Sequence, residues 1–519
     1  MRASQSTGIA IFLVLSTVLC VVYSLLIGFY DYKDGLVYYV NAYSIYKHGV
    51  LLPGFSDWHS FSGGTDLVEF YTANTGYSAF LALVFSLFDF ARPWVAMAVS
   101  AAFYIAGVGF FASFAYKKLP AWGATLLLIL VTTHSHILGF AIRPLTDPPF
   151  FGCMMALLWF SDAYPRRHYL FGFITGFAIF LREPTILVLP LLPILVTEDF
   201  KPRSYLLCLF RICLGSLPWL ALMALGAELF TTGDASAPEN HYVGAIPHLI
   251  SLFSPSRWVS NVDLSFSRLF RFMEIGIPAG SLLAVSLMHT RDYPHRRIAW
   301  FTVLYLATLI FIESASEIMT GRYLTPILPA ALFAAWGAAE FLMGPLAKRR
   351  VLAFALSFFF LLPAMNSAVF LTRRIPHISP DNLFTVNYAA LERSLASVGV
   401  DGTILSNTIE AYTVQDGKRI VAAPVRFADF AAGGRNRELS AIVFLFNKVV
   451  NDPQLGYHRW TARKTDGLAD YAGRYGDWIG PLGQDVIVDA SGNRFEKVFE
   501  EKTATTFSVV FKPVLETDS

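Results

Sequence analysis

Residues 8–30 read GIAIFLVLSTVLCVVYSLLIGFY, and this stretch decides the fold class of the 519-residue chain. A helix needs roughly 20 apolar residues to cross the hydrocarbon core of a bilayer, and this run has that length without a charge. It is too long, and too weakly flanked by small residues, for a cleaved signal peptide. We therefore predict a first membrane-spanning helix that ends at the polar residues 31–34, DYKD.

The composition of the whole chain agrees with this prediction. Hydrophobic residues make up 55% of the chain and charged residues 15%, and the mean hydropathy is +0.50. So few polar residues cannot coat a water-soluble globule of this size. The net charge is only +2, and the basic residues form short clusters between apolar runs, so the sequence predicts no nucleic-acid partner.

Further apolar runs predict more helices that cross the membrane. They lie near Trp94–Tyr116, Trp122–Phe140, Pro149–Tyr164, Tyr169–Leu181, Thr185–Val196, Tyr205–Leu225, Ile277–Met288, Ile298–Ile312, Leu324–Met343 and Val351–Leu371. If each run crosses once, the chain has about eleven spans. The fold class is therefore a polytopic α-helical membrane protein.

The positions of basic residues predict the orientation of these helices. Lys and Arg concentrate in cytoplasmic loops of membrane proteins. The basic clusters are Lys117-Lys118, Arg166-Arg167, Lys201 with Arg203, Arg291 with Arg296-Arg297, and Lys348-Arg349-Arg350. With these loops inside, we expect a multi-pass protein of the cell (inner) membrane whose N-terminus is cytoplasmic.

The first outer loop, residues 30–93, contains an ambiguous apolar segment, Tyr77–Phe90. If this segment crossed the membrane, every later loop would change sides and Lys117-Lys118 would lie outside. It is short, and the next apolar run follows at once. We therefore predict that Tyr38–His48 and Tyr77–Phe90 are helices that lie in the outer interface.

After Leu371 the long apolar runs give way to charges, glycines and short alternating segments. We expect a membrane domain over residues 1–371 and a small α/β domain over residues 372–519, which the predicted orientation places on the extracytoplasmic side of the membrane. Its predicted strands are Thr403–Ser406, Arg419–Ala423, Ala441–Phe446, Asp485–Val488 and Thr506–Phe511, and its predicted helix is Asp381–Val398.

Asp34 is the first candidate for chemistry, because it lies where the first helix leaves the membrane. A carboxylate at the membrane surface can accept a proton from a hydroxyl as a general base, or orient a cation. The alternative is structural, since Asp and Gly are common where a helix ends and the chain turns.

The residues around Asp34 resemble a known signature. Tyr38, Ala42 and Gly49 follow it with the spacing found in the first loop of the GT-C membrane glycosyltransferases, in the branch of the lipid A aminoarabinose transferase and the protein O-mannosyltransferases. In that family an Asp at the start of the loop is the catalytic carboxylate, which Asp34 matches, and Tyr38 then lies at a substrate-binding position. The next residue is often acidic in the family, whereas here it is Gly35.

The resemblance extends to two further segments. Glu69, in VEFY at 68–71, is similar to a functional acid of the family, although the Pro and Lys usually found beside that acid are absent. The segment Arg143-Pro144-Leu145-Thr146-Asp147 is similar to the second outer loop, which implies a second catalytic carboxylate at Asp147 and a substrate contact at Arg143. The alternative for Asp147 is the N-cap of a helix.

Two outer boundaries carry cations in positions similar to those where the family binds the lipid phosphate. They are Arg182, followed by Glu183, and Arg322, followed by Tyr323. A guanidinium suits phosphate because it donates parallel hydrogen bonds and stays charged. The alternatives are side chains that extend to the membrane surface, or a pair between Arg182 and Glu183.

The resemblance implies transfer of a sugar from a polyprenyl-phosphate donor to an envelope glycolipid, glycan or protein acceptor, with inversion at the anomeric carbon. The sequence has no Gly-rich phosphate loop for a nucleotide sugar. No cofactor is required by the pattern, and the acidic residues are compatible with a divalent cation whose ligands are unassigned. The alternatives are a transporter or lipid flippase, and a scaffold that presents the C-terminal domain.

Overall fold

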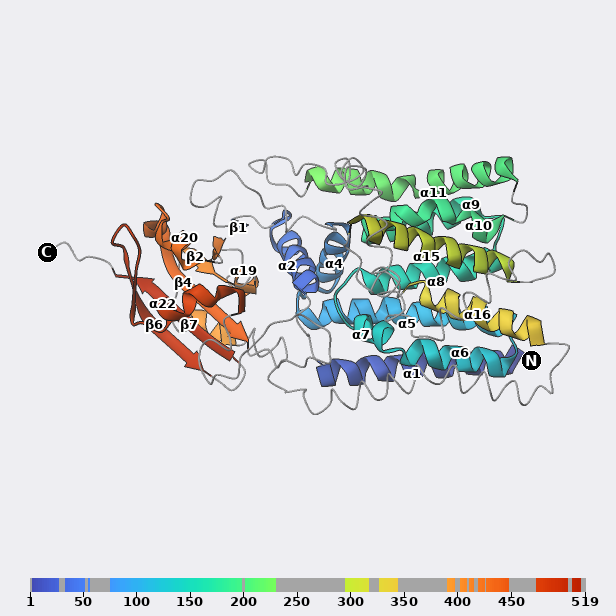
Figure 1. The fold of residues 1–519 in the computed structure, drawn as a ribbon, viewed down its shortest axis with the longest axis horizontal. Coiled ribbons are helices and arrows are strands. Elements are labelled where there is room, and N and C mark those ends of the chain that lie inside the picture. The colour runs from blue at the N-terminus through green and yellow to red at the C-terminus, as the bar shows by residue number, and fades with distance from the viewer. Residues whose placement is uncertain are drawn as a thin grey trace.

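The computed structural model describes residues 2–27, 33–51, 55–56, 75–197, 201–229, 295–316, 326–343, 390–396, 402–407, 410–414, 419–424, 426–447, 473–502 and 506–514. A bundle of helices lies beside a domain built on a seven-stranded sheet, and the chain begins at the end of the bundle opposite that domain (Figure 1). A helical domain with apolar candidate spans and a C-terminal sheet domain is the predicted architecture. The predicted boundary at residue 371 lies outside the described residues.

Helices form in the predicted apolar runs. The bundle contains α1 (Arg2–Ile27), α5 (Pro93–Lys118), α6 (Ala121–Thr133), α7 (Ser135–Ala141), α8 (Asp147–Ala163), α9 (His168–Leu181), η2 (Glu183–Leu191), α10 (Pro193–Val196), α11 (Pro202–Leu229), α15 (Arg296–Ser316) and α16 (Leu328–Met343). In the described part of the chain, three helices are long and apolar enough to cross a membrane, α1, α5 and α11. Two predicted spans, Ile277–Met288 and Val351–Leu371, lie outside it, so the number of spans stays a prediction.

Two segments predicted as single helices are broken. The run Trp122–Phe140 divides into α6 and α7 at His134, whose ψ of 123° is extended. Just before it, Thr132 and Thr133 each donate to a carbonyl one turn back, at 2.7 Å, and such bonds compete with the helical ladder. The run Thr185–Val196 forms the 3₁₀ helix η2 and then α10, because Pro190 and Pro193 lack the N–H that a continuous α-helix needs.

Helices α2 (Lys33–His48) and α4 (Thr75–Phe88) come from the first outer loop. They run across the direction of the bundle helices, between the bundle and the sheet domain (Figure 1). The rings of Tyr38 and Tyr77 meet edge to face at 5.6 Å, and the Tyr46 hydroxyl donates to the Asp89 carboxylate at 2.7 Å. The pair therefore forms a layer over the end of the bundle, and its location in the membrane interface stays a prediction.

The sheet has the strand order β1-β3-β2-β4-β7-β6-β5. The strands are β1 (Phe55–Ser56), β2 (Thr403–Ser406), β3 (Ile420–Ala422), β4 (Leu439–Asn447), β5 (Val486–Val488), β6 (Arg494–Lys502) and β7 (Thr506–Pro513). The first four in this order are parallel neighbours, and the rest pair antiparallel. The predicted α/β domain is therefore present, with two strands that the sequence did not indicate, β1 and β6.

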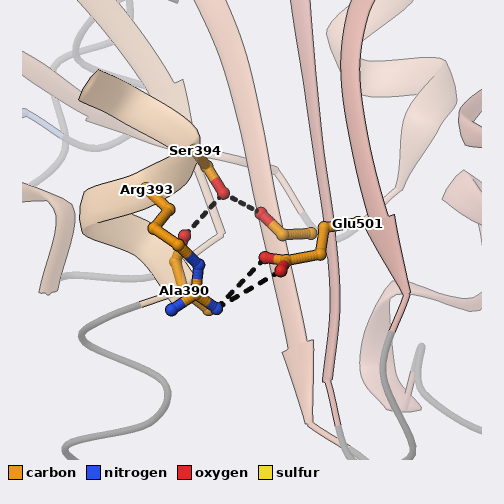
Figure 2. A network of polar contacts seen from close by, with 5 residues as sticks. Ala390, Arg393, Ser394 and Glu501 are labelled. Carbon is orange, nitrogen blue, oxygen red and sulfur yellow. Dashed lines mark hydrogen bonds and ion pairs between the residues drawn. The ribbon is translucent and has the colours of Figure 1, made fainter. Parts of the chain in front are cut away.

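A helix over residues 390–396 lies against this sheet and is the described part of the predicted helix Asp381–Val398. Figure 2 shows how it is held: the Ser394 hydroxyl lies 2.6 Å from the Ser508 hydroxyl on β7, and Arg393 pairs with Glu501 on β6 at 3.3 Å. On the same face as Ser394, Ala390 and Leu391 belong to the apolar cluster that includes strands of this sheet and helices α2 and α4.

Three clusters of buried apolar side chains hold the molecule together. The first fills the bundle, and the third lies on one face of the sheet around Trp478. The second is continuous from the ends of α5 and α9, through α2 and α4, to the opposite face of the sheet, where Ile404 and Ile420 are fully buried. We call it the bridging core, because it joins the sheet domain to the bundle.

The described fold predicts that α4 and the sheet domain lie on one side of the membrane, and the turn between α8 and α9 on the other. After replacement of the four native cysteines, we expect Ser86→Cys and Val488→Cys to react with an impermeant maleimide from outside intact cells. Arg166→Cys should react only after the cells are opened. All three positions are exposed. Labelling of Ser86→Cys only in opened cells would contradict this arrangement.

Candidate functional site

Asp147 is the first residue of α8 and one of the most buried charges of the bundle. Its side chain is 1% exposed, and its Oδ1 accepts a hydrogen bond from Arg182 Nη1, which is 3% exposed. Thr146 occupies the N-cap position, so Asp147 does not act as the N-cap that the sequence allowed. A buried carboxylate paired with a buried guanidinium therefore lies at the end of the bundle that faces the sheet domain.

Arg182 reaches this position because α9 ends there. It is the C-cap residue of α9, with an extended backbone, and its guanidinium lies 5.4 Å from the centre of the Phe150 ring. The alternative pair between Arg182 and Glu183 does not form, since Arg182 binds Asp147 instead. Two of the predicted site residues, 35 positions apart in sequence, are thus brought into direct contact.

Asp34 is the second residue of α2, and its neighbour Gly35 shows what this helix start lies against. A Cβ on Gly35 would come 3.3 Å from Pro144 Cγ, tighter than an ordinary packing contact. The start of α2 therefore lies against the loop that joins Arg143 to Asp147. An acidic side chain at residue 35, common at this position in the family pattern, would need Pro144 to give way by a few tenths of an ångström.

Arg143 and Tyr38 are both buried close to this loop. Arg143 is 4% exposed, and its guanidinium lies 5.7 Å from the Phe140 ring. Tyr38 packs on Tyr77, and burial raises the pKa of Tyr77, with smaller contributions in the same direction from Tyr38 and Asp147. These interactions place α2, α4 and α8 around one region. A role for Tyr38 or Arg143 in binding substrate stays a prediction.

The remaining predicted site residues are Glu69, Arg322 and Tyr323, and all three lie outside the described residues. Within the described ranges, no group of three or more His, Cys, Asp or Glu side chains is placed to hold a metal ion. The divalent cation suggested by the sequence stays a prediction.

Glu183 is a feature that the sequence analysis did not assign to the site. It is 7% exposed, it begins η2 directly after Arg182, and its Oε2 has no hydrogen-bond partner. Burial raises its pKa to about 7. In the described part of the chain, the only buried carboxylate oxygens without a partner are Glu183 Oε2 and Asp147 Oδ2. An acid placed between two apolar runs was the signal that could have identified it.

The arrangement of this chain is similar to three solved structures, each with a TM-score of 0.50. ArnT from Cupriavidus metallidurans bound to undecaprenyl phosphate is 14% identical, over 96% of this chain and 97% of that chain. The chain has the GT-C fold. The Archaeoglobus fulgidus oligosaccharyltransferase in the apo form is 11% identical, over 85% of this chain and 69% of that one. The arabinofuranosyltransferase AftD from Mycobacteria is 12% identical, over 99% of this chain and 40% of that one.

No protein-family model and no curated protein matches this sequence. The likeness of this chain to the three solved structures is therefore a likeness of fold and not of sequence. The fold agrees with the resemblance that the residues around Asp34 suggested.

The buried pair predicts an asymmetric response to mutation. Asp147→Leu should destabilise the protein by about 3–5 kcal/mol, because it leaves the charge of Arg182 buried and unpaired. The double variant Asp147→Leu/Arg182→Met should recover most of this loss, since no unpaired charge remains. Thermal unfolding of the purified protein in micelles measures both.

Asp162 provides the matched control, since it pairs with Lys117, whose side chain is 59% exposed. Asp162→Asn should change the stability by about 1 kcal/mol or less. If Asp147→Leu is as stable as the natural protein, the pair is not formed as described.

Glu183 predicts a dependence of stability on pH. Its folded-state pKa of about 7 lies above the ordinary value of 4.5, so between these two pH values the folded protein holds a proton that the unfolded chain has lost. The destabilisation caused by Glu183 should therefore be absent below pH 4.5, grow as the pH rises to about 7, and stay constant at higher pH.

Glu183→Gln removes this titration. Unfolding in micelles should show the variant about as stable as the natural protein at pH 4.5, and more stable at pH 8. Parallel stability curves for the two proteins across this range would show that Glu183 does not titrate as its burial requires.

Proposed function

We propose that this chain is a glycosyltransferase that moves a sugar from a polyprenyl-phosphate donor to an acceptor at the outer face of the cell membrane, with inversion at the anomeric carbon. The observation that supports this most is a meeting of two features at one end of a GT-C fold. The start of α2, which carries Asp34, lies against the loop before Asp147, and Asp147 forms a buried ion pair with Arg182.

In the proposed reaction, Asp34 accepts the proton of the acceptor hydroxyl while the acceptor oxygen bonds to the anomeric carbon and the bond to the lipid phosphate breaks. A guanidinium has five N–H donors, so Arg182 can hold Asp147 and also stabilise the phosphate oxygens as negative charge develops on them. Asp147 then fixes the direction of Arg182. Arg143 and Arg322 are the further cations proposed for the phosphate, and Glu69, Tyr38 and Tyr323 the further contacts to substrate.

The position of the buried charges supports an enzyme over a transporter or flippase. A transporter holds ionisable groups near the middle of the membrane, where its cargo crosses. In the described helices and their connecting turns, the buried Asp, Glu and Arg side chains of the bundle are Arg143, Asp147, Arg182 and Glu183, and all lie next to the ends that face the sheet domain. The buried histidines are placed differently, with His134 between α6 and α7 and His295 just before α15. The distribution of the carboxylates and guanidiniums suits chemistry at one surface.

Asp34→Asn tests the proposed base. We expect turnover to fall about 100-fold or more, because the amide cannot accept the proton. Asp31→Asn, which removes the neighbouring acid, serves as the matched control and should retain activity. The assay follows transfer of a labelled sugar from polyprenyl phosphate by protein in lipid nanodiscs, and folded Asp34→Asn with near-normal turnover would refute the role.

The acceptor is best identified in cells. Mass spectrometry of envelope glycolipids and glycans, with and without the gene, should show a difference of one sugar on the natural acceptor. An unchanged profile together with an altered leaflet distribution of a lipid precursor would favour the transporter.

A further inference from the structure

Helix α2 carries Asp34 at its start, and its other end is fixed by a local set of hydrogen bonds. Gly49, with φ of 75°, ends the helix, and its N–H donates to the Ile45 carbonyl at 2.9 Å. The Ser44 hydroxyl donates to the Val50 carbonyl at 2.8 Å. The last turn of α2 and the residues after it therefore form one closed unit.

The sheet domain reaches into this unit through Tyr412, on the short helix α19 (Glu410–Val414). The Tyr412 and Ser44 oxygens lie 3.1 Å apart, and both side chains are fully buried. Because the single hydroxyl proton of Ser44 goes to Val50, Tyr412 is the donor in this contact. The Tyr412 ring also meets His48 edge to face at 6.2 Å.

A second connection follows α2 along the chain. Strand β1 pairs in parallel with β3, with Phe55 opposite Ile420 and Ser56 opposite Val421. The first outer loop thus contributes an edge strand to the C-terminal sheet. Both the end of α2 and the strand that follows it are held by the same domain.

The sheet domain is in turn anchored to the bundle. Residues 390–396 contact β6 and β7 (Figure 2), and Glu392 lies 3.9 Å from Arg92, the residue before α5. Through Tyr412 and β3, this anchored domain therefore acts on the helix that carries the proposed base.

We infer that Tyr412 is a positioning residue for the transfer reaction: its hydrogen bond to Ser44 fixes the helix α2 and, through it, the place of Asp34. This inference rests on the proposed function. The helix has 16 residues without a break, so we expect freedom at its end to be transmitted to its start. A displacement of about 1 Å of a catalytic group can cost about 100-fold in rate, so loss of one bond at a distance is measurable.

Three variants test the inference in the full chain in nanodiscs: Tyr412→Phe, Ser44→Ala and the double variant. We expect each single change to lower kcat about tenfold while KM for the donor stays nearly constant, because donor binding does not depend on the base. The double variant should be no slower than the slower single one, as expected for two residues that act through one contact.

Hydrogen exchange gives a readout that needs no substrate. Amides of residues 33–48 should exchange faster in Tyr412→Phe than in the natural protein, while those of α5 and α8 stay unchanged. Trp478→Phe is the matched control: it removes one buried hydrogen bond of the same domain, from Trp478 Nε1 to the Pro424 carbonyl, on the opposite face of the sheet. It should leave kcat and α2 exchange as they are.

The outcomes separate the two proposals. A natural protein that transfers no sugar from any polyprenyl phosphate refutes the proposed function, and the exchange data still decide whether Tyr412 holds α2. Active protein with unchanged kcat and unchanged exchange in Tyr412→Phe refutes the positioning role. Additive losses in the double variant refute the route through Ser44.

Discussion

The bridging core is the constraint on which the arrangement of this molecule depends. Helix α4 has buried side chains toward the bundle, such as Tyr77, and α2 has buried side chains toward the sheet domain, such as Ser44, so the pair of helices is covered on both sides only when both neighbours are present. Burial of apolar surface has no direction of its own, and directional contacts such as the bond between Tyr412 and Ser44 select one register. The start of α2, where Asp34 lies, is therefore set by packing on two sides.

The elements with a clear pattern of apolar residues could be predicted from the sequence. The helix predicted at Tyr169–Leu181 is α9, His168–Leu181, and the strand predicted at Thr403–Ser406 is β2 with the same bounds. Two kinds of feature could not be predicted. The break at His134 lies inside an apolar run that carries no Gly or Pro at that point. In β6, over Arg494–Lys502, Phe495 is the one buried residue and six of the nine residues are charged, so hydrophobicity alone gives too weak a signal.

The site could be predicted only in part, because sequence identifies single charged residues but not the contacts between them. Asp147 and Arg182 were each recognisable as charges at an outer boundary, but their contact depends on how α8 and α9 pack, which local sequence does not specify. The short strand β1 is a more extreme case, because two residues of the first outer loop pair with a strand more than 300 positions away, Ile420 and Val421. At Gly35 the sequence shows only the departure from the family pattern. The structure adds that Pro144 lies close beside this residue.

The end of the bundle that faces the sheet domain also carries charges that stability alone does not account for. A buried ion pair is seldom more stable than apolar side chains of the same size, and a buried carboxylate without a partner is less stable still. Asp147 with Arg182 is the first case, and Glu183, the residue after Arg182, is the second. At the opposite end of the bundle the charges are arranged differently, since Lys117 and Lys118 share Asp162 near the surface. Groups that lower stability at one end of a membrane domain are expected where charge must be transferred, so the position of these residues argues for chemistry at that surface.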